Sequence, residues 1–368
     1  MVFKMSKIEN IDKDLKFETS IKEDNIKFFD VKDEPFDLYG FYSAKKGEMF
    51  LRMPEDTATK INDFIGDPLC KMTSGGRVRF KTNSPYVAIS VKYPQPRVMR
   101  MNHMSMLGTT GFDMYVYENG KYKYSNMRNF IPPNEILLDG YESIHYFKNT
   151  DLKDITINFP LYNEVLELYI GIEEGSILDH GEKYINEKPV VCYGSSIAQG
   201  ACASRPGNSY MGMISRKFNL DFLNLGFSGS AKGEAEMAEY IGNLHPAAFI
   251  CEYDQDAPDA EYLEKTHERF FKIIREKNPD MPIILMTSIF RQEWTQSIYD
   301  ARKEIILKTY NNALKSGDKN VYYLDCQNIF DIFGGDNGIT DGSHPNDLGF
   351  MCMAEGISKV LKEAMNLK

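Results

Sequence analysis

Apolar and polar residues alternate over short segments throughout the first half of the chain, from Asn25 to about Ile172. A period of two is typical of strands with one buried face, and the glycines, prolines and asparagines between the segments are typical of turns. Asn119-Gly120 separates two such segments and predicts a hairpin with these residues at its tip. We therefore expect an antiparallel β-sandwich. The predicted strands are 77–81, 87–93, 112–117, 121–124, 155–159 and 165–170.

After Pro189 the pattern changes to short apolar runs separated by longer segments with helical spacing. Residues 259–277, for example, carry apolar side chains at i, i+3 and i+4, and Asn278-Pro279 ends the pattern. Short buried strands with helices between them predict a parallel sheet that helices cover on both faces. The predicted strands are 190–193, 222–225, 247–251, 283–287 and 321–324.

These two patterns predict the domain organisation of the chain. We expect an N-terminal extension (1–24), a β-sandwich domain (25–172), a linker (173–188) and an α/β domain (189–368). The linker is rich in turn residues and ends at Pro189. The length of 368 residues agrees with two domains, at roughly 150 residues each.

Composition and charge limit the classes of partner. The chain is 42% hydrophobic and 26% charged, as soluble globular proteins are, and its net charge of −10 without a basic stripe argues against nucleic acid. No apolar stretch approaches the ~18 residues that cross a membrane, and Met1–Glu18 lacks the apolar core of a signal peptide, so we expect a cytoplasmic protein. The six cysteines are scattered without C-x-x-C spacing, which predicts neither disulfides nor a zinc site, and we expect no cofactor.

Candidate catalytic residues stand where the predicted parallel strands end. Ser196 follows the first strand in a Gly-Ser-Ser turn, and a glycine-rich loop, 226–233, follows the second strand. Ligand sites of open α/β sheets lie at this edge, where backbone N–H groups can stabilise a developing negative charge. Asp341 and His344 share a tight loop near the C-terminus. An imidazole that acts as a general base needs a carboxylate to fix its tautomer, so this pair suits that role.

Each of these features also has a purely structural interpretation. A Gly-Ser-Ser turn and a glycine-rich loop are more often simple connections, and the acidic segment after the third strand (Glu252, Asp254, Asp256) is more often a solvated turn than a metal or acid–base site. Taken together, however, the features predict an acyl-transfer site in which the nucleophile precedes the acid–base pair. The other histidines are more typical of surface or packing positions: His103, His145, His180, His245 and His267.

This ordered set resembles the SGNH (GDSL-like) hydrolase superfamily over residues 189–368. The resemblance implies an α/β/α sandwich with a five-stranded parallel sheet and a serine esterase activity. It implies that Ser196 is the nucleophile, Asp341 the orienting acid and His344 the base. It also assigns oxyanion-hole N–H groups to Ser196 and Gly229.

The first half adds to this resemblance. The sequence Gly111-Phe112-Asp113-Met114-Tyr115 resembles the Gly-x-Asp-Leu-Tyr signature of a β-sandwich domain that precedes some SGNH catalytic domains. In those relatives the sandwich abuts the active site. The resemblance therefore implies that the first half abuts the active site.

One position departs from the family pattern. The third block of the family supplies an asparagine whose amide donates to the oxyanion, and by position this chain has Asp256 there, with Gln255 beside it. An ionised carboxylate has no proton to donate, and loss of one such donor costs roughly 10²–10³ in rate. Three explanations are open: Asp256 is protonated, Gln255 replaces it, or the activity is weak or altered.

The leading hypothesis is a serine esterase that removes a small acyl group, such as acetyl, from a carbohydrate or another polar metabolite. An acyltransferase with the same site is the first alternative, because the sandwich domain can shield the site from water. A catalytically weak glycan-binding protein is the second, with sandwich tyrosines that stack on sugars, although strand packing is the commoner role of such residues. Arg205 is a further pocket candidate, for which a surface loop position is the simpler interpretation. The tyrosines are Tyr115, Tyr117, Tyr122 and Tyr124.

Overall fold

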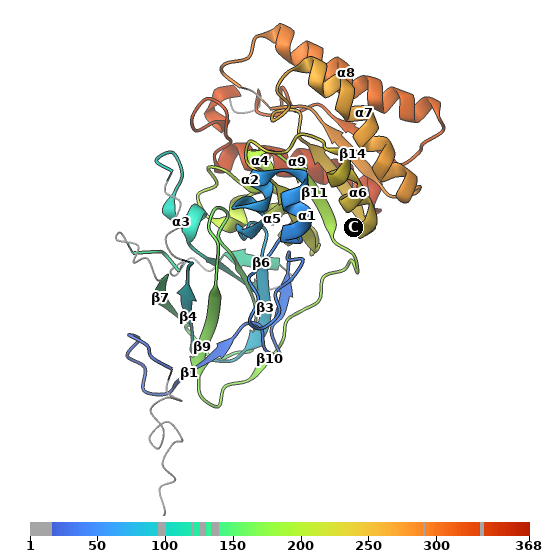
Figure 1. Ribbon diagram of the computed structural model, residues 1–368. Helices are drawn as coiled ribbons and strands as arrows, with labels where there is room; N and C mark the ends of the chain where they lie inside the picture. Colours follow the sequence, from blue (N-terminus) through green and yellow to red (C-terminus); the bar gives the residue numbers. More distant parts are fainter. Residues whose placement is uncertain are drawn as a thin grey trace, which may run out of the picture.

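The computed structural model describes residues 17–94, 101–118, 121–124, 130–133, 140–289, 291–331 and 335–368, with the backbone alone for residues 118 and 121–124. Figure 1 shows the two halves of the chain as two layers, with the antiparallel sheets of the first half below the helices and parallel sheet of the second half. The predicted fold class, a β-sandwich followed by an α/β domain, is confirmed.

The first half forms two antiparallel sheets. Its strands are β1 (Ile26–Asp30), β2 (Asp37–Tyr39), β3 (Arg77–Thr82), β4 (Tyr86–Lys92), β5 (Asp113–Glu118), β6 (Lys121–Tyr124), β7 (Gly140–Tyr146), β8 (Lys153–Asn158), β9 (Glu167–Glu173) and β10 (Leu178–His180). One sheet has the order β1-β9-β4-β7 and the other β10-β3-β8-β5-β6, with β2 paired to β3. Alternate side chains of both sheets, such as Phe80 and Ile89, pack in one hydrophobic cluster, which explains the period of two in the sequence.

Two details of this half bear on the sequence predictions. Strands β5 and β6 pair from Tyr115↔Tyr124 to Glu118↔Lys121, as the predicted hairpin requires, while its tip, Asn119-Gly120, lies outside the described residues. Strand β10 lies within the predicted linker and pairs with β3. The first half therefore continues into part of residues 173–188.

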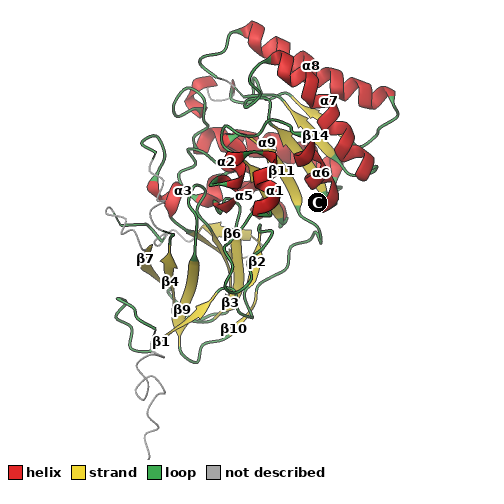
Figure 2. Ribbon diagram, viewed as in Figure 1, coloured by secondary structure: helices red, strands yellow, loops and turns green. Residues whose placement is uncertain are grey.

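The second half is a five-stranded parallel sheet with the order β12-β11-β13-β14-β15. Each strand lies within a residue of its predicted bounds: β11 (Val190–Gly194), β12 (Phe222–Gly226), β13 (Ala248–Glu252), β14 (Ile283–Met286) and β15 (Val321–Leu324). The helices are α4 (Ser196–Gln199), α5 (Tyr210–Phe218), α6 (Ala235–Leu244), α7 (Ala260–Lys277), α8 (Gln296–Lys315) and α9 (Asp347–Ala364), with 3₁₀ turns η4 (Pro206–Asn208) and η6 (Gly335–Gly338). Helices α5 and α9 pack together, and so do α6, α7 and α8, on the two faces of the sheet (Figure 2).

The strand register brings the ends of the central strands to one edge. Gly194, the last residue of β11, pairs with Gly226 of β12 and with Glu252 of β13. Ser196 opens α4 directly beyond this point. The residues that follow each strand are therefore neighbours, as the edge rule for parallel sheets requires.

A short helical segment of the first half belongs to the core of the second half. It contains α1 (Glu55–Ile61), α2 (Asp63–Gly66) and the 3₁₀ turn η3 (Leu69–Lys71), whereas α3 (Met106–Thr110) lies near the sandwich strands (Figure 1). Ala58 and Ile65 are fully buried in the same hydrophobic cluster as the parallel strands. The two halves thus share a core across the predicted boundary. Among the described helices, none has the length and apolar character needed to cross a membrane.

Candidate active site

The nucleophile candidate Ser196 is presented by a short helix at the end of a buried strand. Ser195 caps this helix: its Oγ accepts from Ile197 N at 3.1 Å and donates to Glu252 Oε1 at 2.9 Å. Gly200, with φ of 103°, ends the helix after one turn in a conformation that favours glycine. The strand, the cap and the short helix fix Ser196 at the edge of the sheet.

Ser196, His344 and Asp341 form one chain of hydrogen bonds. Ser196 Oγ lies 2.8 Å from His344 Nε2, and His344 Nδ1 lies 2.8 Å from Asp341 Oδ2. Asp341 Oδ1 also accepts from the backbone N–H of His344 at 2.9 Å, which holds the carboxylate in place within the tight loop. Ser196 lies 148 residues before His344 in the sequence, and it meets the Asp341–His344 loop because β11 and the loop before α9 reach the same edge of the sheet.

The charge of Asp341 fixes the tautomer of the imidazole. Burial alone raises the pKa of Asp341, but the hydrogen bonds from the ring and backbone of His344 outweigh it and lower the pKa to about 2. An ionised carboxylate only accepts hydrogen bonds, so Nδ1 of His344 carries the ring proton. Nε2 therefore keeps a lone pair that faces the hydroxyl of Ser196.

A cavity of about 260 Å³ opens in front of this hydrogen-bonded chain. All three predicted oxyanion-hole residues, Ser196, Gly229 and Asp256, line it. Gly229 has φ of 69°, a left-handed conformation that a glycine adopts without strain. The remaining lining residues are Ser195, Ser228, Gln255, Arg291, Ser343 and His344.

Asp256 occupies the position at which the family pattern has asparagine. Its Oδ2 accepts from the backbone N–H of Ala231 at 3.1 Å, so the carboxyl holds the glycine-rich loop. Burial raises the pKa of Asp256 to about 7, although the Ala231 hydrogen bond and the charges of Arg291 and Lys232 oppose the shift. A substantial fraction of Asp256 is therefore protonated near neutral pH.

Gln255, its neighbour, is 8% exposed, and its Nε2 has no hydrogen-bond partner among the described residues. An unpartnered buried amide is costly and indicates a group that is kept for a ligand or a water molecule. Asp256 and Gln255, the two residues considered in place of the family's asparagine, thus both line the cavity.

The acidic segment after β13 is not a solvated turn. Glu252 is 1% exposed and Asp254 is 2% exposed. Asp254 accepts from the backbone N–H of Ser288 at 2.9 Å, which ties the ends of β13 and β14 together. Burial raises the pKa of Glu252, and Ser195 Oγ donates to it. These carboxyl groups support the edge of the sheet, whereas the sequence pattern favoured exposure.

Arg291 also lines the cavity and is not among the residues predicted from the sequence. Its Nη1 donates to the backbone oxygen of Gln255 at 3.3 Å. Because Arg291 follows the fourth parallel strand, β14, the same edge rule that selected Ser196 would have selected it.

The first half supports Ser196 from behind. Tyr162 Oη donates to the backbone oxygen of Ser196 at 3.2 Å, and Ser74 Oγ donates to the backbone oxygen of Gln199 at 2.6 Å. The fully buried Arg52 donates to the backbone oxygens of Asn224 at 3.0 Å and Gly226 at 2.7 Å. These bonds position α4 and the loop after β12. The bonded residues are far apart in the sequence, so no local sequence pattern predicts these contacts.

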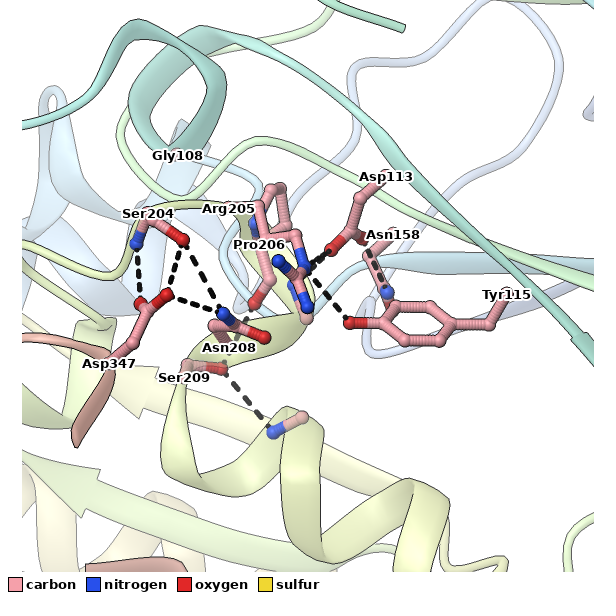
Figure 3. Close-up of polar contacts among 12 residues, drawn as sticks. Gly108, Asp113, Tyr115, Asn158, Ser204, Arg205, Pro206, Asn208, Ser209 and Asp347 are labelled. Atoms are coloured by element: carbon pink, nitrogen blue, oxygen red, sulfur yellow. Dashed lines mark hydrogen bonds and ion pairs between the residues drawn. The ribbon is translucent and has the colours of Figure 1, made fainter. Parts of the chain in front are cut away.

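The aspartate of the Gly-x-Asp-Leu-Tyr-like motif joins the two halves (Figure 3). Asp113 is fully buried and accepts from Asn158 Nδ2 at 2.7 Å and from the backbone N–H of Gly207 at 2.9 Å. Arg205 Nε lies 3.7 Å from Asp113 Oδ2, so Arg205 belongs to this contact and is not a free surface arginine. Tyr115, one of the candidate sugar-stacking residues, is 2% exposed, whereas Tyr117 is 41% exposed. The side chains of Tyr122 and Tyr124 lie outside the described residues.

A second carboxylate, Asp347, links the segment after Ser196 to the segment of His344 (Figure 3). It accepts from the backbone N–H of Ser204 at 2.8 Å and from Asn208 Nδ2 at 2.7 Å. Asp347 is the first residue of α9, three residues beyond His344. The contact therefore ties the segment after Ser196 to the loop that carries His344.

Two family models match the chain in the order that this arrangement implies. The GDSL-like lipase/acylhydrolase family matches residues 187–362, and the GxDLY domain, the N-terminus of SGNH-hydrolase-type esterases, matches residues 26–178. Residues 187–362 belong to the GDSL-like (SGNH) hydrolase family. The resemblance inferred from the motifs is thereby confirmed. No curated protein matches the sequence significantly.

Solved structures with both halves are similar to this chain. A protein described as a GDSL-like lipase of Bacteroides ovatus is 26% identical, with a TM-score of 0.82 over 94% of this chain and 99% of its own. The salicylyl-acyltransferase SsfX3 of a tetracycline biosynthetic pathway is 20% identical, with a TM-score of 0.75 over 94% and 100%. A family two carbohydrate esterase of Cellvibrio japonicus is 11% identical, with a TM-score of 0.60 over 93% and 98%. The last two show the shared fold alone.

Proposed function

We propose that this protein is a serine ester hydrolase that removes a small acyl group, such as acetyl, from a carbohydrate or another polar metabolite. The observation that carries the proposal is the chain of two 2.8 Å hydrogen bonds from Ser196 through His344 to Asp341 at the cavity. This arrangement is the one that nucleophilic acyl transfer needs, with a hydroxyl on a base and the base on a fixed carboxylate.

The reaction then follows from the geometry. His344 Nε2 accepts the Ser196 proton while Ser196 Oγ attacks the ester carbonyl, and Asp341 stabilises the imidazolium that forms. The tetrahedral oxyanion receives hydrogen bonds from the backbone N–H groups of Ser196 and Gly229. His344 returns the proton to the leaving alcohol. Water, activated by the same imidazole, attacks the acyl-enzyme and releases the carboxylic acid.

The third oxyanion donor comes from the segment after β13. Asp256 donates a proton only in its protonated form, and near neutral pH both forms are populated because burial raises its pKa to about 7. Gln255 is a donor at every pH, and its amide nitrogen has no other partner among the described residues. The activity is therefore expected to depend on the protonation of Asp256.

The cavity supports a small and polar substrate. Its volume of about 260 Å³ lies below the ~300–1,000 Å³ typical of sites for drug-sized ligands, and serines, Gln255 and Arg291 supply polar groups along its wall. The Cellvibrio japonicus protein that shares this fold is a carbohydrate esterase, which agrees with such a substrate.

Ester hydrolysis by matched serine variants tests the proposal. We expect wild type to hydrolyse p-nitrophenyl acetate faster than longer esters, and Ser196→Ala to reduce kcat by at least about 10³-fold. Ser228→Ala is the control, because Ser228 lines the same cavity and its hydroxyl bonds Tyr162 rather than His344 or Asp341. Equal loss in both variants, or no loss in Ser196→Ala, contradicts a Ser196 mechanism.

An acyltransferase is the second candidate function, and the observation in its favour is the contact of the first half with the helix that carries Ser196. Tyr162 and Ser74 of that half bond the helix that carries Ser196, so the sandwich borders the site. SsfX3, which shares the fold, is an acyltransferase. Adding alcohol acceptors to the ester assay distinguishes the two: an acyl-alcohol product that accumulates at the expense of the free acid supports transfer, and free acid alone excludes it.

A further inference from the structure

Four side chains that can bind a metal ion lie close together, and Asp341 and His344 are two of them. The other two are His103, from the sandwich half, and Cys202, from the segment after α4, and one ligand atom from each of the four lies within 4.8 Å of all the others. His103 Nε2 is 3.9 Å from Asp341 Oδ2, and the rings of His103 and His344 stack with centroids 5.8 Å apart. Cys202 Sγ is 3.6 Å from the backbone oxygen of His103.

The ligand set is typical of zinc. A thiolate, two imidazoles and a carboxylate are the side chains that Zn²⁺ prefers, at roughly 2.3 Å for sulfur and 2.0–2.2 Å for nitrogen and oxygen. Ligand atoms at these bond lengths on a tetrahedral ion lie roughly 3.3–3.8 Å from one another. The four ligand atoms lie within 4.8 Å of one another, so movements of about 1 Å bring them to the distances that Zn²⁺ needs. His103 is exposed and can make such a movement.

We propose that His103, Cys202, Asp341 and His344 form a Zn²⁺ site, and that Zn²⁺ bound there switches off ester hydrolysis. The second part rests on the proposed function, whereas the first part does not. When Zn²⁺ binds, the Cys202 thiol loses its proton to solvent and coordinates the ion as a thiolate. The Asp341 carboxylate also coordinates the ion.

The inhibition follows from the ring of His344. The nitrogen that faces Asp341 is Nδ1, and Nε2 faces Ser196. When Nδ1 binds the ion, the single proton of the neutral ring moves to Nε2. Nε2 then has no lone pair for the Ser196 proton, and the hydroxyl stays inactive.

Metal binding is measured first, without reference to activity, on the Ser196→Ala variant, which keeps all four ligands. Calorimetry is expected to show one Zn²⁺ per chain, and Co²⁺ in its place is expected to give a thiolate-to-metal charge-transfer absorption band. Cys202→Ser is expected to abolish this band, and His103→Ala to weaken Zn²⁺ binding by at least ~10-fold, since even indirect losses around a metal cost 10–100-fold. Absence of binding, or unchanged binding in both variants, overturns the site.

Inhibition is then measured on enzymes with an intact Ser196. Zn²⁺ is expected to inhibit wild type, and Cys202→Ser and His103→Ala are expected to hydrolyse esters as wild type does while needing at least ~10-fold more Zn²⁺ for half inhibition. Cys352→Ser is the control for Cys202→Ser, because Cys352 is 8% exposed and Cys202 is 9% exposed. His180→Ala is the control for His103→Ala, because His180 also lies beside carboxylates, those of Glu34 and Asp37. Inhibition that is equal in all five proteins overturns the proposed control of activity.

Because His103 is exposed, His103→Ala remains informative if Cys202→Ser fails to fold. An enzyme without esterase activity that still binds Zn²⁺ through Cys202 contradicts the proposed function and leaves the metal site supported. An active enzyme that binds no Zn²⁺ gives the opposite result.

Discussion

Single residues set the chemistry at the edge of the parallel sheet, and Asp256 is the one that departs from the family pattern. A carboxyl group there holds the glycine-rich loop through Ala231 in either protonation state, but its ionised form opposes an oxyanion. The charged groups around it are Arg291 and Lys232, which favour ionisation, and Glu252, whose own pKa is raised. The proposed activity is therefore expected to depend on pH through Asp256.

We predict that Asp256→Asn increases kcat, and that the ratio of variant to wild-type kcat rises as the pH passes from 6 to 8. The reason is that the pKa of Asp256 is about 7, so the wild-type carboxyl loses its proton over this range while the amide remains a donor. A pH–rate profile of both proteins measures the ratio. A ratio that does not change with pH contradicts the role assigned to Asp256.

The same substitution is expected to change stability with a defined sign. The pKa of Asp256 is raised in the folded state above the ~3.9 of an unfolded chain, so the folded state favours the protonated form and loses stability as the pH rises from about 4 to about 7. Asp256→Asn is therefore expected to raise the melting temperature more at pH 8 than at pH 4. Thermal melts at the two pH values test this difference.

Asp341 acts at the same scale through the tautomer of His344. We predict that Asp341→Asn lowers kcat by about 10²–10⁴-fold with little change in KM, because an amide can also donate to Nδ1 and so stabilise the wrong tautomer. Asp331→Asn, an exposed position on the same part of the chain, is the control and is expected to behave as wild type. A loss that appears only in KM contradicts this role.

At the scale of elements, the start of α9 is tied to the segment that follows α4. Asp347 accepts from Ser204 and Asn208, and its negative charge also suits a helix N-terminus. The bond spans the two loops that carry Ser196 and His344. The geometry of the hydrogen-bonded chain thus depends on a residue that does not belong to it.

We predict that Asp347→Ala lowers the free energy of unfolding by about 2–3 kcal/mol, since hydrogen bonds to a charged group contribute about 1.5–3 kcal/mol each. It is also expected to lower kcat. Glu355→Ala, on the exposed face of the same helix, removes a surface ion pair with Lys217 and is expected to cost less than about 1 kcal/mol. Urea unfolding and ester hydrolysis of the two variants provide the comparison, and equal effects contradict the link.

At the scale of the whole molecule, the two halves are joined by polar groups that are completely buried. Arg52 carries a charge inside the shared core, where burial lowers its pKa to about 10. Among the described residues it has no carboxylate partner, and it donates instead to backbone oxygens of both halves, Met72 and Gly226 among them. A buried cation of this kind is costly to remove, because several carbonyl groups lose their donor at once.

We predict that Arg52→Met destabilises the protein by at least about 3 kcal/mol and weakens the coupling between the halves. In wild type, the fluorescence of Trp294, the one tryptophan and a residue of the second half, and far-ultraviolet circular dichroism are expected to report one urea transition. In Arg52→Met the two transitions are expected to separate. Separate transitions already in wild type contradict a shared core.

The sequence by itself determined the fold class, the five parallel strands and the strand ends at which the candidate site lies, and it predicted the sandwich strands other than β1, β2, β7 and β10. Period-two alternation predicted the sandwich, and five apolar runs predicted the parallel sheet. The edge rule and the Asp-x-x-His spacing selected Ser196, Asp341 and His344. The structure brings these three residues within hydrogen-bond distance. These features are local, because burial on one face of a strand or helix leaves its period in the sequence.

Only the tertiary structure decided which distant residues meet at these elements. Asp113 bonds Gly207, Arg52 bonds Gly226, and His103 and Cys202 gather beside Asp341. No sequence period links such positions, since each contact depends on how the two halves pack. Burial likewise decided the state of Asp256, whose raised pKa comes from the removal of water around one carboxyl group.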